Sequence, residues 1–458
     1  MSKTEKYDII VVGAGPSGLL AARAAGVSGA RVALLERKPD ITRLDRMCGQ
    51  TLVSMNDYYF DDLVSYNRQA KRIGFLRSGF SFGYDGPVKN CNAWHIFSPD
   101  GGRLLFGVPE ETRQKGDSGA VGLAYDKEIL FRCLLDEAVQ AGVDVFTGVD
   151  VTGVTATSQG VAARGGNRLF EGEYLIAADG TNSRIARLLG FNSDRTFYCY
   201  LLCKGYYMRH VRVPANDILI SSIAYTPEAP GYMFIFPRPY DDELTVAFLA
   251  LDPRVSLDHV AGYFMHDNPF FASWFRDAER VKEFASAQYV YSPVSEPYRD
   301  RVLLAGDTGS CQELENTGAM ISGWRAGTAV AAALKEDRVG IASRAISEYV
   351  GWWQTTYIEK CPHEAYIMNF ALPYVLDTED DFNYLCSLVT EPLPPCWNPY
   401  AAMGYMGRLV EGLVPAIQKG RPDMMPKLAK MTQPMTDILK ETTGACRPLM
   451  DLERNSEC

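Results

Sequence analysis

The 458-residue sequence predicts an α/β (α+β) protein with a parallel sheet, an inserted antiparallel sheet and a helical C-terminal region. Residues 7–12 are β-branched like a buried strand, and a glycine turn, a helix and a second strand at 31–36 complete a βαβ unit. Between 195 and 290, short aromatic and β-branched segments alternate with turn residues, which is typical of an antiparallel sheet. From Ala342 onward the sequence has helical character and is rich in Trp, Tyr, Met and Pro.

The turn after the first strand carries three glycines spaced as Gly13-x-Gly15-x-x-Gly18, with Pro16 and Ser17 before the third. The first glycine permits a tight turn, the second lets the backbone approach a pyrophosphate, and the third lets the helix pack closely on the strand. The helix that begins at Ser17 would present its unpaired N–H groups to the phosphates. A purely structural glycine turn is the alternative.

An acidic residue, Glu36, ends the second strand, eighteen residues after Gly18. A carboxylate at that place can accept hydrogen bonds from an adenosine ribose. Arg37 follows it and is a candidate contact of the same nucleotide. The strand, the turn, the helix and the acidic residue together predict a Rossmann-like dinucleotide site.

Two pairs of Asp and Gly close later strands. Asp179-Gly180 follows the apolar segment 174–178, and Gly306-Asp307 follows the segment 302–305. Such a pair alone is more typical of a simple turn, but ligands of parallel sheets bind at the carboxyl ends of the strands. We therefore expect both pairs to contact the cofactor, with Asp307 on the ribityl chain of FAD.

A helix running to about Leu334 follows the second pair. Its first turn, Thr317-Gly318-Ala319, would direct N–H groups at the N1–C2 carbonyl edge of the flavin and stabilise the anionic reduced form. The polar residues before it, Glu313, Glu315 and Asn316, either lie in a solvated turn or contact the substrate or the flavin.

The order of these motifs resembles the flavoproteins with the p-hydroxybenzoate hydroxylase fold. Two further segments resemble their geranylgeranyl reductase branch. Cys48-Gly49-Gln-Thr-Leu52 is similar to the branch's Cys-Gly-x-x-Leu segment near the flavin, and Tyr232–Pro237 is similar to its Tyr-x-Trp-x-Phe-Pro motif, which lines the substrate cavity. The resemblance extends to about residue 335. Phe234 stands where the branch usually has Trp, and the segment after Asp307 lacks the usual proline and second glycine.

The resemblance makes Cys48 a candidate catalytic and cofactor-binding residue, with Gly49 beside it at the flavin. Arg43 and Arg46 flank the thiol and would favour its thiolate form. The thiol would donate a proton, tune the flavin or attach to it covalently. A free cysteine is otherwise most often a small buried apolar residue.

Tyr232, Phe234 and Phe236 alternate along one strand, so their side chains share one face of the sheet. That face is either core or, as the resemblance implies, the wall of an apolar substrate cavity. Tyr232 is also a candidate proton donor.

The motifs divide the chain into three predicted parts. Residues 1–190 and 300–340 form a discontinuous FAD-binding domain, residues 191–299 form an antiparallel-sheet substrate domain, and residues 341–458 form a helical region that covers part of the pocket.

The resemblance implies an FAD-dependent oxidoreductase that reduces carbon–carbon double bonds of an isoprenoid or lipid-like substrate. Reduced flavin N5 would deliver hydride. A monooxygenase or halogenase acting on an aromatic substrate is the main alternative, and a non-catalytic electron-transfer or assembly protein is another. Because a second GxGxxG is absent from the sequence, the electron donor is either transiently docked NAD(P)H or a reduced carrier protein.

Composition limits partners and location. The net charge of −10, without a basic stripe, argues against nucleic-acid binding. Eleven cysteines at irregular spacings and a polar N-terminus predict reduced thiols in a cytoplasmic protein. The five histidines form no ligand array, so no metal site is predicted. No apolar segment approaches the ~18–20 residues of a membrane span, although peripheral membrane contact is compatible with the sequence.

Overall fold

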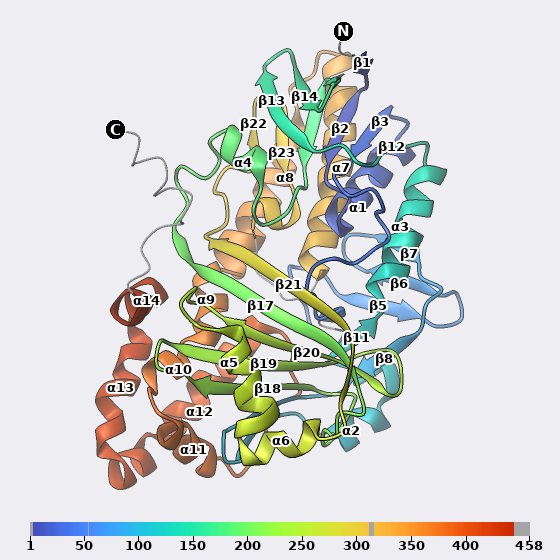
Figure 1. The fold of residues 1–458 in the computed structure, drawn as a ribbon. Helices are drawn as coiled ribbons and strands as arrows, with labels where there is room; N and C mark the ends of the chain where they lie inside the picture. The colour runs from blue at the N-terminus through green and yellow to red at the C-terminus, as the bar shows by residue number, and fades with distance from the viewer. Residues whose placement is uncertain (1–2, 54, 311–315, 444–458) are drawn as a thin grey trace.

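The computed structural model describes residues 3–53, 55–310 and 316–443 (Figure 1). A six-stranded sheet in the order β12-β3-β2-β16-β23-β22 forms the core of the upper half of the molecule as drawn. All its strand pairs are parallel except β22 with β23. Its strands are β2 (Ile9–Val12), β3 (Val32–Leu35), β12 (Asp144–Phe146), β16 (Tyr174–Ala177), β22 (Tyr298–Arg299) and β23 (Val302–Leu304). The predicted βαβ unit and the two later strands therefore share one sheet, as expected.

Three long helices accompany this sheet: α1 (Pro16–Val27), α3 (Lys127–Gln140) and α7 (Thr317–Arg338). The helix α7 packs directly on α1. A Cβ atom on Gly323 would lie 2.6 Å from Ser17 Cα, and one on Gly327 would lie 2.8 Å from the Ala21 carbonyl carbon. Because the two backbones approach this closely, the start of α7 is fixed relative to the glycine turn.

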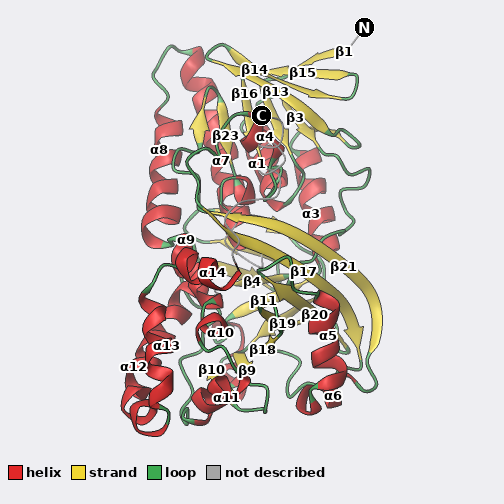
Figure 2. Cartoon of the chain, turned by 60° about the vertical axis from the view of Figure 1, so that its left-hand side comes forward, coloured by secondary structure: helices red, strands yellow, loops and turns green. Residues whose placement is uncertain are grey.

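The second large sheet has seven strands in the order β10-β9-β18-β19-β20-β17-β21. Figure 2 shows its long strands β17 and β21 curving across the middle of the molecule. Its strands are β9 (Trp94–Phe97), β10 (Arg103–Phe106), β17 (Phe197–Arg209), β18 (Leu219–Tyr225), β19 (Pro230–Pro237), β20 (Glu243–Ala250) and β21 (Glu279–Tyr291). The antiparallel insert is thus present, but the sheet is not confined to residues 191–299, because β9 pairs in parallel with β18.

Smaller sheets extend both halves. The order β1-β15-β14-β13 includes an N-terminal strand that the sequence analysis does not predict, and two three-stranded sheets lie within the segment 51–125. The strands of these sheets are β1 (Lys3–Lys6), β4 (Thr51–Val53), β5 (Val64–Asn67), β6 (Arg72–Phe75), β7 (Phe80–Gly83), β8 (Val88–Cys91), β11 (Gly122–Tyr125), β13 (Val151–Thr157), β14 (Gly160–Gly165) and β15 (Arg168–Gly172).

The C-terminal region is helical, as predicted. Its α-helices are α8 (Arg344–Trp353), α9 (His363–Ile367), α10 (Leu372–Val375), α11 (Glu379–Ser387), α12 (Pro399–Gly420), α13 (Met425–Ala429) and α14 (Met435–Thr443). The first of them, α8, lies beside α7 in the upper half of both views, and the later ones lie beside the seven-stranded sheet, toward the lower left (Figures 1 and 2). The remaining α-helices are α2 (Pro109–Gln114), α4 (Arg184–Leu188), α5 (Leu257–Gly262) and α6 (Pro269–Phe275). Within the described residues, the helices are too short or too polar to cross a bilayer. The division into three domains stays a prediction.

Candidate active site

The glycine turn between β2 and α1 forms an open cradle. Gly13 has a φ of +99°, and a Cβ there would lie 2.7 Å from the Ala178 carbonyl carbon. A Cβ on Gly18 would lie 2.9 Å from the carbonyl carbon of Gly13. The space beside Gly15, by contrast, contains no described atom within 4 Å, and the N-terminus of α1 has no side-chain cap among the described residues. Its first N–H groups are therefore oriented for a phosphate.

A buried hydroxyl supports a ligand in this cradle. Ser17 Oγ is buried and has no hydrogen-bond partner within the described part of the chain, and Pro16 occupies the first turn of α1 beside it. A Cβ on Gly306, whose φ is +62°, would lie 2.9 Å from Ser17 Cβ. Since buried polar atoms normally have partners, the cradle fits the pyrophosphate of FAD.

Glu36 connects the second strand to the turn. Its carboxylate is buried and accepts hydrogen bonds from Ala14 N at 2.7 Å and from Lys38 N at 2.9 Å. Each carboxylate oxygen has a further lone pair, so the group can also accept the ribose hydroxyls of the adenosine. Arg37 next to it is exposed.

The two Asp/Gly pairs meet at the carboxyl edge of the sheet. Thr308 Oγ1 accepts from Gly180 N at 3.0 Å and donates to Asp179 Oδ1 at 3.2 Å. Asp179 also accepts from Ser183 Oγ at 2.6 Å and from Ile185 N at 3.2 Å, so it holds the start of α4. The structure thus gives Asp179 a structural role, and its contact with the cofactor stays a prediction.

Asp307 faces a small pocket of about 80 Å³ at the end of β23. By area the residue is only partly buried, because it faces that pocket, but the surrounding protein raises the pKa of its carboxyl. Lys127 and Arg46 oppose this rise through their positive charges. An acceptor held here, next to the first turn of α7, suits the hydroxyls of a ribityl chain.

The first turn of α7 is held from both sides. Thr317 Oγ1 accepts from Val53 N at 3.3 Å, and the Gly318 carbonyl accepts from Tyr357 OH at 3.1 Å. The Ala319 carbonyl accepts from Ser322 Oγ at 3.2 Å. Glu313 and Glu315 lie outside the described residues.

Cys48 and Asn316 line the same small pocket as Asp307. Cys48 Sγ accepts hydrogen bonds from Gln50 N at 3.4 Å and from Asn316 Nδ2 at 3.3 Å. Lys127 Nζ donates to Asn316 Oδ1 at 2.8 Å, and because an ammonium can only donate, it fixes the orientation of the amide. Lys127 and its contact to Asn316 are absent from the sequence analysis, since a lysine at a helix start is ordinarily exposed.

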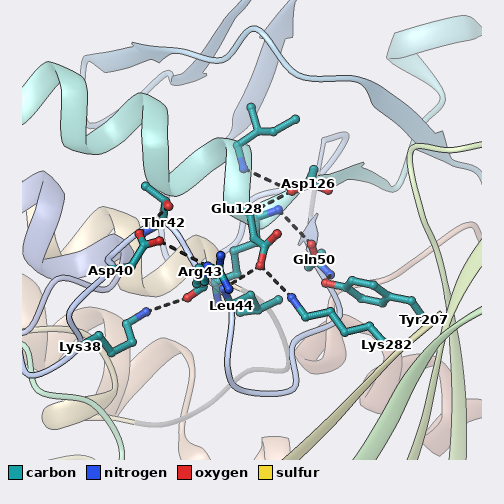
Figure 3. Close-up of polar contacts among 12 residues, drawn as sticks. Lys38, Asp40, Thr42, Arg43, Leu44, Gln50, Asp126, Glu128, Tyr207 and Lys282 are labelled. Carbon is teal, nitrogen blue, oxygen red and sulfur yellow. Dashed lines mark hydrogen bonds and ion pairs between the residues drawn. The ribbon is translucent and has the colours of Figure 1, made fainter. Parts of the chain in front are cut away.

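The loop that carries Cys48 is held at two points (Figure 3). Glu128 Oε1 accepts from Leu44 N at 2.9 Å and from Lys282 Nζ at 2.8 Å. Further along, Gln50 Oε1 accepts from Lys127 N at 2.9 Å, and Gln50 Nε2 donates to Tyr207 OH at 2.5 Å. These contacts fix the loop between α3 and the seven-stranded sheet.

The two arginines near Cys48 have different environments. Arg43 is exposed and pairs with Asp40 at 3.4 Å (Figure 3). The effect of Arg43 on Cys48 stays a prediction, and the contact the structure gives this side chain is the one with Asp40. Arg46 Nη1 lies 3.7 Å from the position of a Cβ on Gly180, near Asp307.

A second, much larger cavity of about 640 Å³ lies between the seven-stranded sheet and the C-terminal helices. Its lining is mostly apolar, with a few polar residues such as Asn369 and Glu411 among it. Tyr232, Phe234 and Phe236 of β19 form part of its wall, so their shared face is the cavity side of the sheet. The helical wall includes Met368, Phe370, Met403, Met406, Val410, Val414, Met425, Leu428 and Met431. The C-terminal region therefore covers this pocket, as predicted.

Tyr232 lines the large cavity but not the small pocket. Its hydroxyl donates to the Phe370 carbonyl at 2.8 Å, and burial raises its pKa well above the ordinary value. Of the two candidate proton donors, Cys48 is therefore the one that lies beside Asp307 and the start of α7.

Comparison with known proteins agrees with this geometry. The model of the family described as FAD binding domain matches residues 6–200. The chain is an FAD-dependent oxidoreductase, as the motifs predicted.

Two curated relatives and two solved structures are similar to this chain in sequence and in fold, respectively. The chain is 26% identical to digeranylgeranylglycerophospholipid reductase of Methanocella arvoryzae over 75% of its own length and 82% of that protein. It is 24% identical to the protein of that name from Methanocaldococcus jannaschii, over 77% and 83%. These relatives confirm the resemblance to geranylgeranyl-type reductases.

The solved structures confirm the fold. A geranylgeranyl bacteriochlorophyll reductase-like protein from Thermoplasma acidophilum superposes with a TM-score of 0.65 at 19% identity, covering 94% of this chain and 100% of that one. A variant of the halogenase PltM in complex with FAD superposes with a TM-score of 0.57 at 13% identity, covering 96% of each chain.

Proposed function

We propose that this protein reduces carbon–carbon double bonds of an isoprenoid or similarly apolar lipid chain. The observation that carries the proposal is the pairing of an apolar cavity of about 640 Å³ with a small pocket that contains Cys48, Lys127 and Asp307. The large cavity suits a long apolar chain, because burying apolar surface is worth about 25 cal/mol per Å². The names of the two curated relatives support this substrate class.

In this proposal FAD is held by three groups of residues. The pyrophosphate lies at the cradle, the adenosine ribose at the end of β3, and the flavin portion near Cys48 and the start of α7. The proposed contacts are Gly13, Gly15, Pro16, Ser17, Gly18, Glu36, Arg37, Cys48, Gly49, Asp179, Gly180, Gly306, Asp307, Thr317, Gly318 and Ala319. Reduced FAD, when bound, supplies a hydride to a substrate carbon.

The protein's own contribution is to bind the chain, exclude water and hold a proton. Cys48 Sγ accepts two N–H groups, from Gln50 and Asn316, so its S–H proton is free to point into the small pocket. We assign proton donation to Cys48, with Tyr232, Phe234 and Phe236 forming the substrate wall. Because Lys127 fixes the Asn316 amide, the sulfur is kept in one position.

Anaerobic product analysis tests this function. Holoenzyme reduced with dithionite is mixed without oxygen with geranylgeranyl alcohol, a geranylgeranyl lipid and a panel of aromatic compounds. The proposal predicts products that gain two hydrogen atoms per reduced double bond and a matching reoxidation of the flavin. Turnover that requires oxygen, with an oxygen or halogen atom in the product, would instead establish the monooxygenase or halogenase alternative.

Cys48→Ala tests the proton donor, with Cys203→Ala as its control because both side chains line the small pocket. The proposal predicts that Cys48→Ala slows the reductive half of turnover by about 10²-fold or more, as for loss of a positioned acid, while Cys203→Ala does not. Equal rates in both variants would remove Cys48 from the chemistry.

The proposal also covers partners and location. The electron donor is NAD(P)H or a reduced carrier protein, and stopped-flow reduction of the flavin by each tells them apart. No disulfide joins the cysteines of the described residues to one another, which supports the cytoplasm. An apolar substrate also supports peripheral contact with a bilayer, which vesicle flotation tests.

A further inference from the structure

The large cavity and the small pocket occupy one face of the seven-stranded sheet. Residues directly opposite one another on paired strands share a face. Ile223, Tyr232, Leu249 and Cys203 form such a row across β18, β19, β20 and β17. The first two line the large cavity, and the last two line the small pocket. The boundary between the two spaces therefore falls between β19 and β20.

Among the described residues, Phe236 alone lines both spaces. Its side chain is buried and stacks on Phe234, with ring centroids 6.0 Å apart and an interplanar angle of 18°. Phe234, one step back along the strand face, lines the large cavity only. The Phe236 ring thus stands at the boundary itself.

The opposite wall of this boundary is the segment that carries Cys48. Cys48 and Gly49 line the small pocket, whereas Thr51 and Val53 line the large cavity, so the segment passes from one space to the other. A Cβ on Gly49 would lie 2.8 Å from Phe236 Cε1. With any larger residue at this position the ring would have to shift from its present place against this segment.

We propose that Phe236 is a movable partition, which the reacting end of the substrate must displace to reach the small pocket. This inference rests on the proposed function and deepens it. The residues that hold a proton, Cys48 and Lys127, lie on the far side of the ring from the apolar cavity. Phe236 is therefore a specificity-determining residue, because the chain shape that can push the ring aside sets which double bonds are reduced.

Chemical labelling of Cys48 tests the partition without turnover. Holoenzyme is treated with N-octylmaleimide, an apolar reagent that suits the large cavity, and with iodoacetamide, a small polar one. Peptide mass spectrometry then measures the rate at Cys48 alone. In the wild type, octylmaleimide in the large cavity can reach Cys48 only in the minor population of molecules in which the Phe236 ring has moved aside. Phe236→Ala removes the ring, so it is expected to accelerate octylmaleimide labelling by about tenfold or more. Iodoacetamide labelling, which reports direct solvent access, is expected to stay unchanged.

Phe234→Ala is the matched control, because it removes a stacked ring from the large cavity without opening the boundary. Phe236→Leu keeps an apolar side chain in case the alanine variant does not fold, and it is expected to give an intermediate acceleration. Equal acceleration in the Phe234 and Phe236 variants, or acceleration with both reagents, would overturn the partition. An inactive enzyme with the expected labelling pattern would refute the proposed reductase function and leave the partition standing.

Discussion

The close approach of α1 and α7 makes a quantitative prediction for Gly327→Ala. The new Cβ would lie 2.8 Å from the Ala21 carbonyl carbon and closer still to its oxygen, whereas ordinary contacts begin at 3.4 Å. The helices must therefore separate by roughly 0.6 Å or more. Both contacting atoms belong to the backbone, so no side chain can rotate away.

The expected free energy follows from two opposing effects. Overpacking costs about 1–3 kcal/mol, and an unrelieved backbone clash belongs at the upper end of that range. Replacing glycine by alanine inside a helix returns about 1 kcal/mol. We expect Gly327→Ala to lower the free energy of unfolding by about 2 kcal/mol, and to weaken FAD binding because the start of α7 moves.

The assay is urea denaturation of the apoprotein, together with titration by FAD. Gly412→Ala in α12 is the control, because its Cβ would meet no described atom within 4 Å, and it should stabilise the protein by about 0.5–1 kcal/mol. If Gly327→Ala were as stable as Gly412→Ala and bound FAD normally, the packing of α7 on α1 would not position the site.

Three further predictions concern single polar groups. Glu36→Ala removes the acceptor of the Ala14 and Lys38 N–H groups, and since hydrogen bonds to charged groups contribute about 1.5–3 kcal/mol, the Kd for FAD measured by fluorescence should rise tenfold or more. If the Kd for FAD rose less in Glu36→Ala than in Arg37→Ala, which changes an exposed side chain, the role of Glu36 would be refuted. Burial raises the pKa of the Asp307 carboxyl above its ordinary value of 3.8, so this group destabilises the folded protein as pH rises above 3.8. Asp307→Asn should therefore raise the Tm of the apoprotein at pH 7 but weaken FAD binding. An unchanged or lower Tm would contradict that sign. Burial also lowers the pKa of the His95 imidazole below 6.5, so the free energy of unfolding falls as pH drops through 6.5. His95→Gln should flatten this pH dependence. If the free energy of unfolding changed equally in the wild type and the variant between pH 7 and 5, His95 would be excluded as the source of the dependence.

The cofactor-binding elements could be predicted because local sequence dictates them. The glycine turn, Glu36 and the two Asp/Gly pairs each follow a strand, and parallel strands bring their carboxyl ends together wherever they lie in the chain. The three motifs accordingly meet through Gly13 beside Ala178, Gly306 beside Ser17, and Thr308 between the two pairs.

Long-range pairings could not be predicted from local pattern. The parallel pairing of β9 with β18 joins residues more than a hundred positions apart, and neither strand carries a signal for it. Likewise, Lys127 has the position of an ordinary exposed helix-start residue, and its burial depends on Asn316, a residue 189 positions away that lies just before α7. Arg43 lies close to Cys48 in sequence, but its side chain turns to Asp40.

The boundary at Phe236 is the clearest case. Alternation along β19 correctly placed Tyr232, Phe234 and Phe236 on one face, but it could not show that this face is divided between two spaces. That division depends on Gly49 and the C-terminal helices, which approach the sheet from distant parts of the chain.

A single-turnover experiment with deuterated flavin tests the central claim most directly. Holoenzyme reduced in deuterated water is mixed anaerobically, still in deuterated water, with a geranylgeranyl substrate, and the product is analysed by mass spectrometry and NMR. Because the hydrogen on flavin N5 and the Cys48 thiol proton both exchange with solvent, the account predicts two deuterium atoms per reduced double bond, one on each carbon, in proportion to the flavin reoxidised and without oxygen. Flavin that stays reduced until oxygen enters, with no hydrogen added to the chain, would contradict it.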